Sequence, residues 1–314
     1  MAGFTGAPSL ADEQDAFRSM YAARVQEFTE AGRGAGLTPA AGDGEKIAVV
    51  LVDYQHDFVD PGGTLSVPGA QADVARFLHW FYASAQSITT IYASLDTHLP
   101  YQIFFSAWWH DPRTGEHPQP FTPISATDVN TGRWQPLFHP EWSISYVNKL
   151  AEQARKDLMI WPHHTMQGTS GHALVAPISE AIAWHSAARR TQPVYITKGL
   201  TERTEFYGIF GAEVQDPADP TSGLNTTLLD AVTRHERVYI AGEAKSHCVL
   251  ETARQLVAHL SPRPQLLSRL YLLSDCTSSV QHPEVDFEAL AEQELALMQQ
   301  KGVQIVKSSE ISGK

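Results

Sequence analysis

Residues 46–54, KIAVVLVDY, contain an unbroken aliphatic run that ends at an aspartate. A continuous rather than alternating apolar run is typical of a parallel strand buried on both faces. Similar runs, rich in Val, Ile and Tyr, occur at 89–96, 193–199, 237–243, 269–275 and 303–309. Helical patterns separate most of them, at 70–88, 171–190, 225–235, 247–260 and 284–301. This order predicts a three-layer α/β/α fold, in which helices cover both faces of a mostly parallel, six-stranded sheet.

Two segments fall outside this alternation. Residues 10–32 have apolar side chains at helical spacing, and a Gly- and Pro-rich linker follows them. We therefore expect residues 1–45 to form a helical extension ahead of a main domain at 46–314. Residues 107–157 hold four of the seven tryptophans and no clear strand. We predict that this segment is an insertion packed over the domain, with its aromatic side chains in a core or an interface.

The composition excludes several classes of protein. The chain has 314 residues, 43% of them hydrophobic, and a net charge of −12, which argues against a nucleic-acid partner. Its two cysteines are too few for a disulfide scaffold and fit a reducing compartment. The N-terminal residues do not resemble a signal peptide, and no apolar run is long enough to cross a bilayer. We expect a cytoplasmic protein without a membrane partner.

Chemically useful side chains follow the predicted strands. Asp53 follows the first strand, Asp96 and His98 follow the second, and the third ends in Lys198. Cys248 comes shortly after the fourth strand, where a helical pattern begins. Ligands of open α/β sheets bind beyond the carboxyl ends of the strands, so we expect these residues to meet at one rim.

Each of these residues has an ordinary structural interpretation beside the functional one. The start of a helix stabilises a thiolate, which makes Cys248 a candidate nucleophile, but a buried structural cysteine is an equal alternative. Cys276 is interpreted as structural. Asp53 could move a proton between the thiol and a leaving amine, or could cap a helix or pair with Lys198. Lys198 could also be a solvated lysine at a strand end.

A metal site is a further hypothesis. Asp96 and His98 are two residues apart, and the stretch WPHH at 161–164 adds imidazoles from farther along the chain. One carboxylate and two imidazoles suit zinc-like ions and leave open positions for water or substrate. Because the chain holds 14 histidines, such a combination can also arise by chance.

Five ordered stretches resemble the motifs of the isochorismatase-like cysteine hydrolases, and among them those of the nicotinamidases. They are LVDYQHDFVDPGGTLSVPGA (51–70), YASLDTH (92–98), WPHHTMQGTSGHAL (161–174), ITKG (196–199) and IAGEAKSHCVLETA (240–253). The resemblance runs from about residue 46 to 306, and it implies the Rossmann-like sheet of that family. It covers neither the N-terminal extension nor the 107–157 segment.

The resemblance also implies a catalytic arrangement. It makes Cys248, Asp53 and Lys198 a catalytic triad. It implies an oxyanion hole formed by the backbone N–H groups of Ala244 and Cys248, with a cis peptide bond between Glu243 and Ala244.

Metal and substrate residues follow from the same resemblance. Asp96, His98 and His164 would bind a divalent metal ion, in the first place Zn²⁺, with Fe²⁺ or Mn²⁺ as alternatives, while His163 is a weaker candidate.

Three aromatic residues are substrate-binding candidates. Phe58 and Trp161 match positions that stack on the substrate ring, although core packing explains them equally well. Tyr207, like its neighbour Phe206, is a looser candidate for the pocket.

The implied activity is that of a cysteine amidohydrolase, most like a nicotinamidase, which hydrolyses nicotinamide to nicotinate and ammonia through a thioester. The chain departs from the pattern at Phe104, where many nicotinamidases have a further histidine, and at Thr165, which replaces a cysteine. The alternatives are a related enzyme acting on a ureido or carbamoyl compound, and a non-catalytic scaffold that uses 107–157 as a partner surface. We expect a small-molecule amide as the substrate and a homo-oligomer as the assembly.

Overall fold

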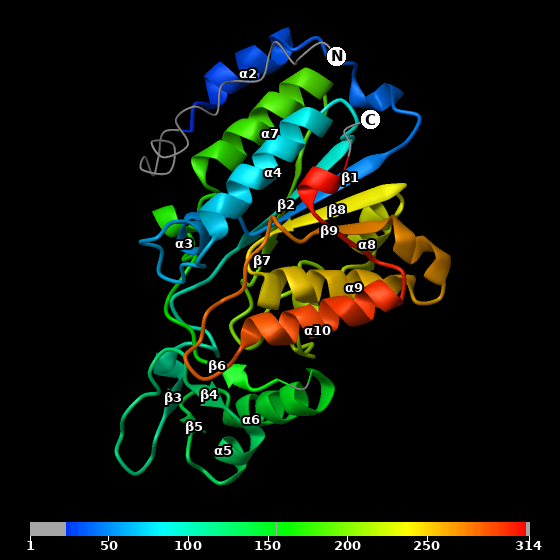
Figure 1. Cartoon of the computed structure of the whole chain (residues 1–314). Helices are drawn as coiled ribbons and strands as arrows, with labels where there is room; N and C mark the ends of the chain where they lie inside the picture. Colours follow the sequence, from blue (N-terminus) through cyan, green and yellow to red (C-terminus); the bar gives the residue numbers. More distant parts are fainter. Residues whose placement is uncertain (1–22, 155, 312–314) are drawn as a thin grey trace.

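A central sheet of six parallel strands organises the computed structural model, which describes residues 23–154 and 156–311 (Figure 1). Its strand order is β10-β9-β8-β1-β2-β7. The strands are β1 (Ile47–Val52), β2 (Thr90–Asp96), β7 (Val194–Lys198), β8 (Arg237–Gly242), β9 (Leu270–Leu273) and β10 (Gln304–Val306). All six lie within the predicted ranges, and every residue of β1 is buried, as its continuous apolar run requires.

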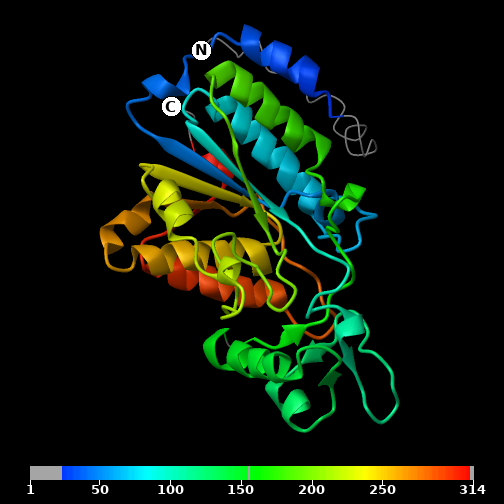
Figure 2. The same ribbon diagram turned by 180° about the vertical axis from the view of Figure 1, so that it is seen from behind.

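Helices cover both faces of the sheet and complete the predicted three-layer fold. α4 (Ala70–Ser84) and α7 (Ala176–Arg189) lie on one face, while α8 (Thr226–Thr233), α9 (Leu250–Leu260) and α10 (Phe287–Gln300) lie on the other (Figures 1 and 2). α7 starts five residues later than predicted. Pro177 stands in its first turn, where a missing N–H is tolerated. The proline therefore marks the true start of the helix, which the periodicity alone predicted too early.

The described part of the N-terminal extension packs against the outer side of α7 (Figure 1). Its helix α2 (Val25–Gly34) approaches α7 so closely that a Cβ on Gly32 would collide with the carbonyl of Trp184. The Arg24 side chain forms an ion pair with Glu180 of α7 at 3.2 Å. The predicted helix at 10–32 lies in large part on residues 1–22, which are outside the described residues.

The segment at 107–157 forms most of a lobe at the end of the molecule away from α2 (Figure 1). It contains α5 (Ala126–Asn130), α6 (Pro140–Lys149) and a π-helical turn (Leu150–Ala154). β3 (Trp109–His110) pairs with β5 (Gln135–Pro136), and β4 (Pro123–Ile124) pairs with β6 (Leu158–Met159). Trp108 and Trp109 are fully buried, which confirms a core role for these two tryptophans.

Short elements connect the main ones. They are α3 (His56–Val59), π-helical η6 (Lys245–Val249) and the 3₁₀ turns at Ala40–Gly42, Ser106–Trp108, Ser170–His172, Pro220–Ser222, Pro264–Arg269 and Ser308–Glu310. Within residues 23–154 and 156–311, no helix combines the length and the hydrophobicity that crossing a membrane requires.

Candidate active site

The carboxyl ends of four neighbouring strands bring the predicted catalytic residues together. Asp53 follows β1, Asp96 ends β2, Lys198 ends β7, and Cys248 lies beyond β8. In the register of the sheet, Asp96 is directly opposite Lys198. The expected meeting of these side chains at one rim is therefore found.

Lys198 is the centre of this group. Its Nζ lies 2.9 Å from Asp53 Oδ2, 2.7 Å from Asp96 Oδ1 and 3.6 Å from Cys248 Sγ. Burial alone would lower the pKa of Lys198, but Asp53 and Asp96 outweigh it and hold the pKa well above its usual value. The ammonium group is therefore charged, and the buried Lys198 is not the solvated strand-end lysine of the alternative interpretation.

Asp53 is fully buried and has a φ of 49°, a left-handed conformation that aspartate tolerates better than most residues. Ser94 Oγ donates a hydrogen bond of 2.5 Å to Asp53 Oδ1. Burial raises the pKa of Asp53 against the lowering effect of Lys198. A carboxylate with a raised pKa is a better proton acceptor than an exposed one, which suits a general base.

Cys248 lies in the π-helical turn η6, which leads directly into α9. Burial raises the pKa of its thiol well above the usual value, although Lys198 acts in the opposite direction. The helix start was expected to favour the thiolate, whereas burial acts against it. The thiol is therefore the resting form, and a nucleophile at this position needs a base to remove its proton.

The peptide bond between Glu243 and Ala244 is cis, as the resemblance implied. It joins the end of β8 to η6, so Ala244 and Cys248 stand in the same connection and both line one cavity. This is the placement that an oxyanion hole built from their two N–H groups requires, and that role stays a prediction.

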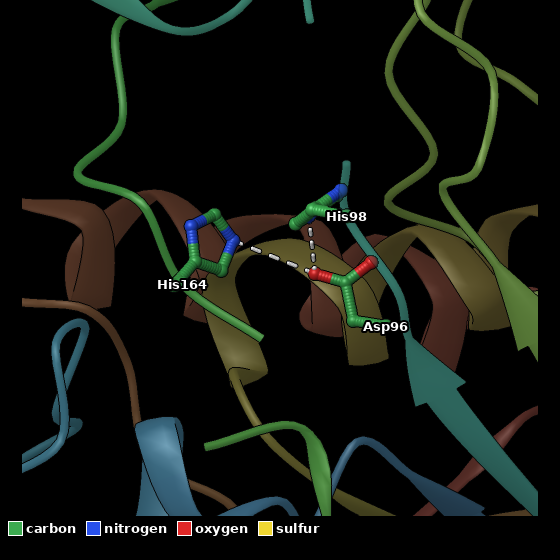
Figure 3. A group of neighbouring side chains, drawn as sticks. All are labelled: Asp96, His98 and His164. Atoms are coloured by element: carbon green, nitrogen blue, oxygen red, sulfur yellow. Dashed lines mark hydrogen bonds and ion pairs between the residues drawn. The ribbon is translucent and has the colours of Figure 1, made fainter. Parts of the chain in front are cut away.

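Asp96, His98 and His164 form a compact buried group (Figure 3). Asp96 Oδ2 lies 2.9 Å from His98 Nε2 and 3.5 Å from His164 Nε2, so both rings point at one carboxylate oxygen. The Nδ1 atoms face backbone carbonyls, at 3.3 Å from Gly199 O and 2.8 Å from Pro162 O. An N–H at each Nδ1 leaves the Nε2 lone pairs free, which is the arrangement of metal-binding histidines. The three side chains therefore fit a divalent metal ion.

The protonation of this group agrees with that fit. Burial lowers the pKa of His98, which keeps its imidazole neutral. Burial acts to raise the pKa of Asp96, but His98 and Lys198 outweigh it and hold the pKa well below the usual value. A neutral imidazole and an ionised carboxylate are the ligand forms that metals bind.

A narrow cavity lies beside both groups. It is lined by the metal-binding candidates, by Ala244 and Cys248, and by all three predicted substrate residues, Phe58, Trp161 and Tyr207; Phe206 also lines it. Its volume is about 20 Å³, which is room for about one water molecule. Side chains of the wall must therefore move before a ring-sized ligand can enter.

Comparison with solved structures identifies the fold. The structure of a nicotinamidase/pyrazinamidase from Acinetobacter baumanii matches with a TM-score of 0.53 and 20% identity, over 86% of this chain and 99% of that one. The yeast nicotinamidase bound to the inhibitor nicotinaldehyde matches with a TM-score of 0.54 and 17% identity, over 83% and 99%. The chain has the nicotinamidase fold. No protein-family model and no curated protein matches the sequence.

Within the nicotinamidase fold, neither His163 nor the residue at position 104 adds a ligand to the group of three. His163 is exposed and its ring stacks on Phe105 at 4.1 Å, outside the group of three ligand candidates. Phe104 is fully buried with its ring 4.8 Å from that of His98. Phe104 therefore places an apolar ring beside the metal-binding candidates, at the position where many nicotinamidases have a further histidine.

Sequence reasoning missed the residues that fix these groups in place. The Gln55 side chain bonds both backbone groups of Asp96, accepting from its N–H and donating to its carbonyl, each at 2.8 Å. Ser94 was missed as the partner of Asp53. Gly199 has a φ of 85°, and a Cβ there would lie 2.9 Å from His98 Cε1. The signal for Gln55 was present, because a polar side chain that comes soon after a buried strand needs a partner.

Proposed function

We propose that this protein is a metal-binding cysteine amidohydrolase that cleaves nicotinamide to nicotinate and ammonia. The observation that carries the proposal is the position of Lys198 Nζ, which contacts the candidate base Asp53, the metal-binding candidate Asp96 and the candidate nucleophile Cys248 at once. A solely structural lysine would need one of these partners. Three of them, of which Asp96 and Cys248 line the cavity, favour a catalytic role.

In the proposed reaction, Asp53 takes the proton from Cys248 while the sulfur attacks the amide carbonyl. Lys198 keeps its proton and balances the negative charge that passes between the two groups. The N–H groups of Ala244 and Cys248 bind the oxygen of the tetrahedral intermediate, a contribution typically worth about 3 kcal/mol for one donor. Asp53 then gives its proton to the departing nitrogen, and ammonia leaves.

The second half of the reaction releases the acid. Asp53 takes a proton from a water molecule, which attacks the thioester, and the carbon–sulfur bond breaks. The proton returns to the sulfur of Cys248, so the residues end in their starting forms. One carboxylate thus serves as base and acid in both halves.

Asp96, His98 and His164 would hold the metal ion, and their nitrogen and oxygen donors suit zinc first, with ferrous iron or manganese as alternatives. When bound, the ion would supply a Lewis acid that can hold a water molecule or a donor atom of the substrate. The aromatic walls formed by Phe58 and Trp161 favour a planar ring over an open-chain ureido compound. A nicotinate complex of a protein from L. infantum, matched with a TM-score of 0.50 and 21% identity over 85% of this chain and 95% of that one, is compatible with this choice.

An ammonia-release screen tests the proposal. Purified protein is incubated with nicotinamide, pyrazinamide and a ureido compound, with and without a chelator. We expect release from nicotinamide, its loss in Cys248→Ala, and its retention in Cys276→Ala, because Cys276 is buried outside the cavity. Release that survives Cys248→Ala would remove the mechanism. Preference for the ureido compound would favour the related amidohydrolase, and no release from any amide would favour the scaffold.

A further inference from the structure

A fully buried glutamate directly precedes Ala244, one of the two predicted donors of the oxyanion hole. Glu243 follows β8 and does not line the cavity. Its Oε2 accepts a hydrogen bond of 3.2 Å from the backbone N–H of Ser278. Among the described residues, no N–H group bonds its Oε1. A buried carboxyl oxygen needs a partner, so the neighbours of this group decide its chemical form.

A second buried acid is hydrogen-bonded to this glutamate. Asp73 of α4 forms a side-chain hydrogen bond with Glu243, and the bond raises the pKa of Glu243. Asp73 Oδ1 also accepts from the guanidinium of Arg76, and Oδ2 accepts from the hydroxyl of Ser278 at 2.5 Å. Ionised carboxylates have only acceptor atoms, so a hydrogen bond between two of these acids requires a proton. Because Asp73 already has a cation and a hydroxyl group, Glu243 is the acid that carries the proton.

The other charges around Glu243 agree with this assignment. Burial raises the pKa of Glu243 well above its usual value, and the charge of Asp73 acts in the same direction. Lys245 acts against them, but its ammonium group is paired with Glu288 and with Glu292, the latter at 2.8 Å. Glu243 is therefore a carboxylic acid at neutral pH.

Ser278 connects this pair of acids to the turn that holds the candidate nucleophile. Its N–H donates to Glu243, and its carbonyl accepts from the N–H of Lys245 at 2.7 Å. Glu243 and Lys245 flank Ala244, so Ser278 fixes the backbone on both sides of the predicted donor. The N–H of Glu243 also donates to the carbonyl of Val52 in β1 at 2.8 Å. The direction of the Ala244 N–H therefore depends on the contacts of Glu243 and Ser278.

We propose that Glu243 is a positioning residue, which shares one proton with Asp73 and so holds the Ala244 N–H where the oxyanion of the tetrahedral intermediate forms. The inference rests on the proposed function, because it assigns a residue that does not line the cavity to one of its steps. The oxygen becomes negative only as the intermediate forms, so a misdirected N–H weakens the transition state more than the bound substrate. The effect therefore appears in kcat and leaves KM nearly unchanged.

Substitutions of Glu243 test this role through kcat and KM for ammonia release from nicotinamide, measured on metal-loaded protein. Glu243→Gln keeps both bonds, because its amide can donate to Asp73 and accept from Ser278, so kcat should stay within about 3-fold of the parent value. Glu243→Leu makes neither bond. Its kcat should fall at least ~10-fold, while KM stays within about 3-fold.

Asp73→Leu tests the partner of Glu243. It should lower kcat in the same way, because it leaves both the Glu243 proton and the Ser278 hydroxyl without their acceptor. The double variant Asp73→Leu/Glu243→Leu should be no slower than the slower single variant, since the two acids act as one unit. Losses that multiply in the double variant would show that the acids act independently.

Glu180→Leu is the matched control. Glu180 is likewise a buried glutamate, but it pairs with Arg24 at the contact between α7 and the N-terminal extension and does not line the cavity. This variant should lower the melting temperature without changing kcat. If Glu243→Leu does not fold, Glu243→Met replaces it, and each variant is assayed below its own melting temperature.

Infrared spectroscopy at neutral pH tests the shared proton without any turnover. The difference spectrum between the parent and Glu243→Gln should show the loss of one protonated carboxyl band. Glu180→Gln should instead lose a carboxylate band, because Arg24 holds Glu180 in an ion pair. A carboxylate band that disappears in Glu243→Gln would overturn the shared proton.

The kinetic outcomes separate this inference from the proposed function. A Glu243→Leu protein that keeps the kcat of the parent overturns the positioning role and leaves the amidase intact. A fall in kcat shared by Glu180→Leu, or a rise in KM without a fall in kcat, also overturns the role. A parent protein that hydrolyses no amide removes the proposed function and the positioning role with it.

Discussion

Replacing Lys198 by methionine tests the buried charges on which the proposed function depends. The substitution keeps an unbranched apolar stem but removes the Nζ that lies 2.9 Å from Asp53 and 2.7 Å from Asp96. Both carboxylates are almost completely buried, so neither can exchange the lost ammonium for bulk water. Removing one partner of a buried ion pair costs about 3–5 kcal/mol of folding free energy. We therefore expect a midpoint of thermal unfolding lower by on the order of 10 °C.

Activity should fall for a related reason. Without Lys198, the pKa of Asp53 rises further, and an already protonated Asp53 cannot accept the proton of Cys248. General-base assistance is typically worth about 10²–10⁴ in rate, so ammonia release from nicotinamide should fall at least ~100-fold. The double variant Lys198→Met/Asp53→Asn removes one of the two unpaired carboxylates. It should regain part of the lost stability but none of the activity.

These two readouts can refute the reasoning separately. If Lys198→Met unfolds at the temperature of the parent, the carboxylates do not depend on the ammonium for their stability in the fold. If the variant keeps more than about a tenth of the activity, Asp53 does not need a cation beside it to act as the base. If the double variant regains activity together with stability, the loss in the single variant came from misfolding and not from the missing charge.

Three further predictions concern single residues. Cys248→Ala should fold normally and release ammonia at least ~1000-fold more slowly than the parent, as measured by a coupled ammonia assay. His164→Ala should purify with less than half the bound metal of the parent, as measured by elemental analysis, because Asp96 and His98 alone offer two ligands; equal metal content would contradict the assignment. Glu205 lines the cavity, and burial raises its native pKa from the ordinary value of 4.5 to about 8. Between these two pH values, the native state keeps a proton that the unfolded chain releases. The stability that the proton provides is therefore lost as the pH rises from 4.5 through 8. Urea unfolding at pH 5 and pH 9 should show that Glu205→Gln loses roughly 2–5 kcal/mol less over this range than the parent does.

The strands of the central sheet were predictable from the sequence because burial on both faces requires a continuous run of apolar residues. Every residue of β1 is apolar and buried, and so is every residue of β8 after Arg237, as expected for strands covered on both faces. The four strands in the lobe have two residues each, which is too short to show any periodicity. They form where the chain between Trp109 and Met159 turns back on itself, and such pairing depends on tertiary packing that local patterns do not record.

The candidate site likewise contains residues that the sequence predicted and residues that it did not. Asp53, Lys198 and Cys248 were predictable because each lies at or beyond the carboxyl end of a strand, and parallel strands end at one rim. Ser94 and Glu205 were not, because nothing in their own neighbourhoods distinguishes them. Ser94 precedes Asp96 by two residues and becomes informative only through its bond to Asp53, which is 41 residues away. Such partners are set by the register of β1 against β2, and the register is a property of the folded sheet.

Asp96 connects the two halves of the site, since its Oδ1 contacts Lys198 and its Oδ2 faces both histidines. Its negative charge is among the causes that raise the pKa of Asp53 and of Cys248. A cation held by Asp96, His98 and His164 would offset that charge and so make the thiol easier to deprotonate, although the ion would not touch the sulfur. The ammonium of Lys198 offsets the same charge from the opposite side of the carboxylate. Removing the metal and removing Lys198 therefore weaken the nucleophile through one shared group, and their effects on the rate should not be additive.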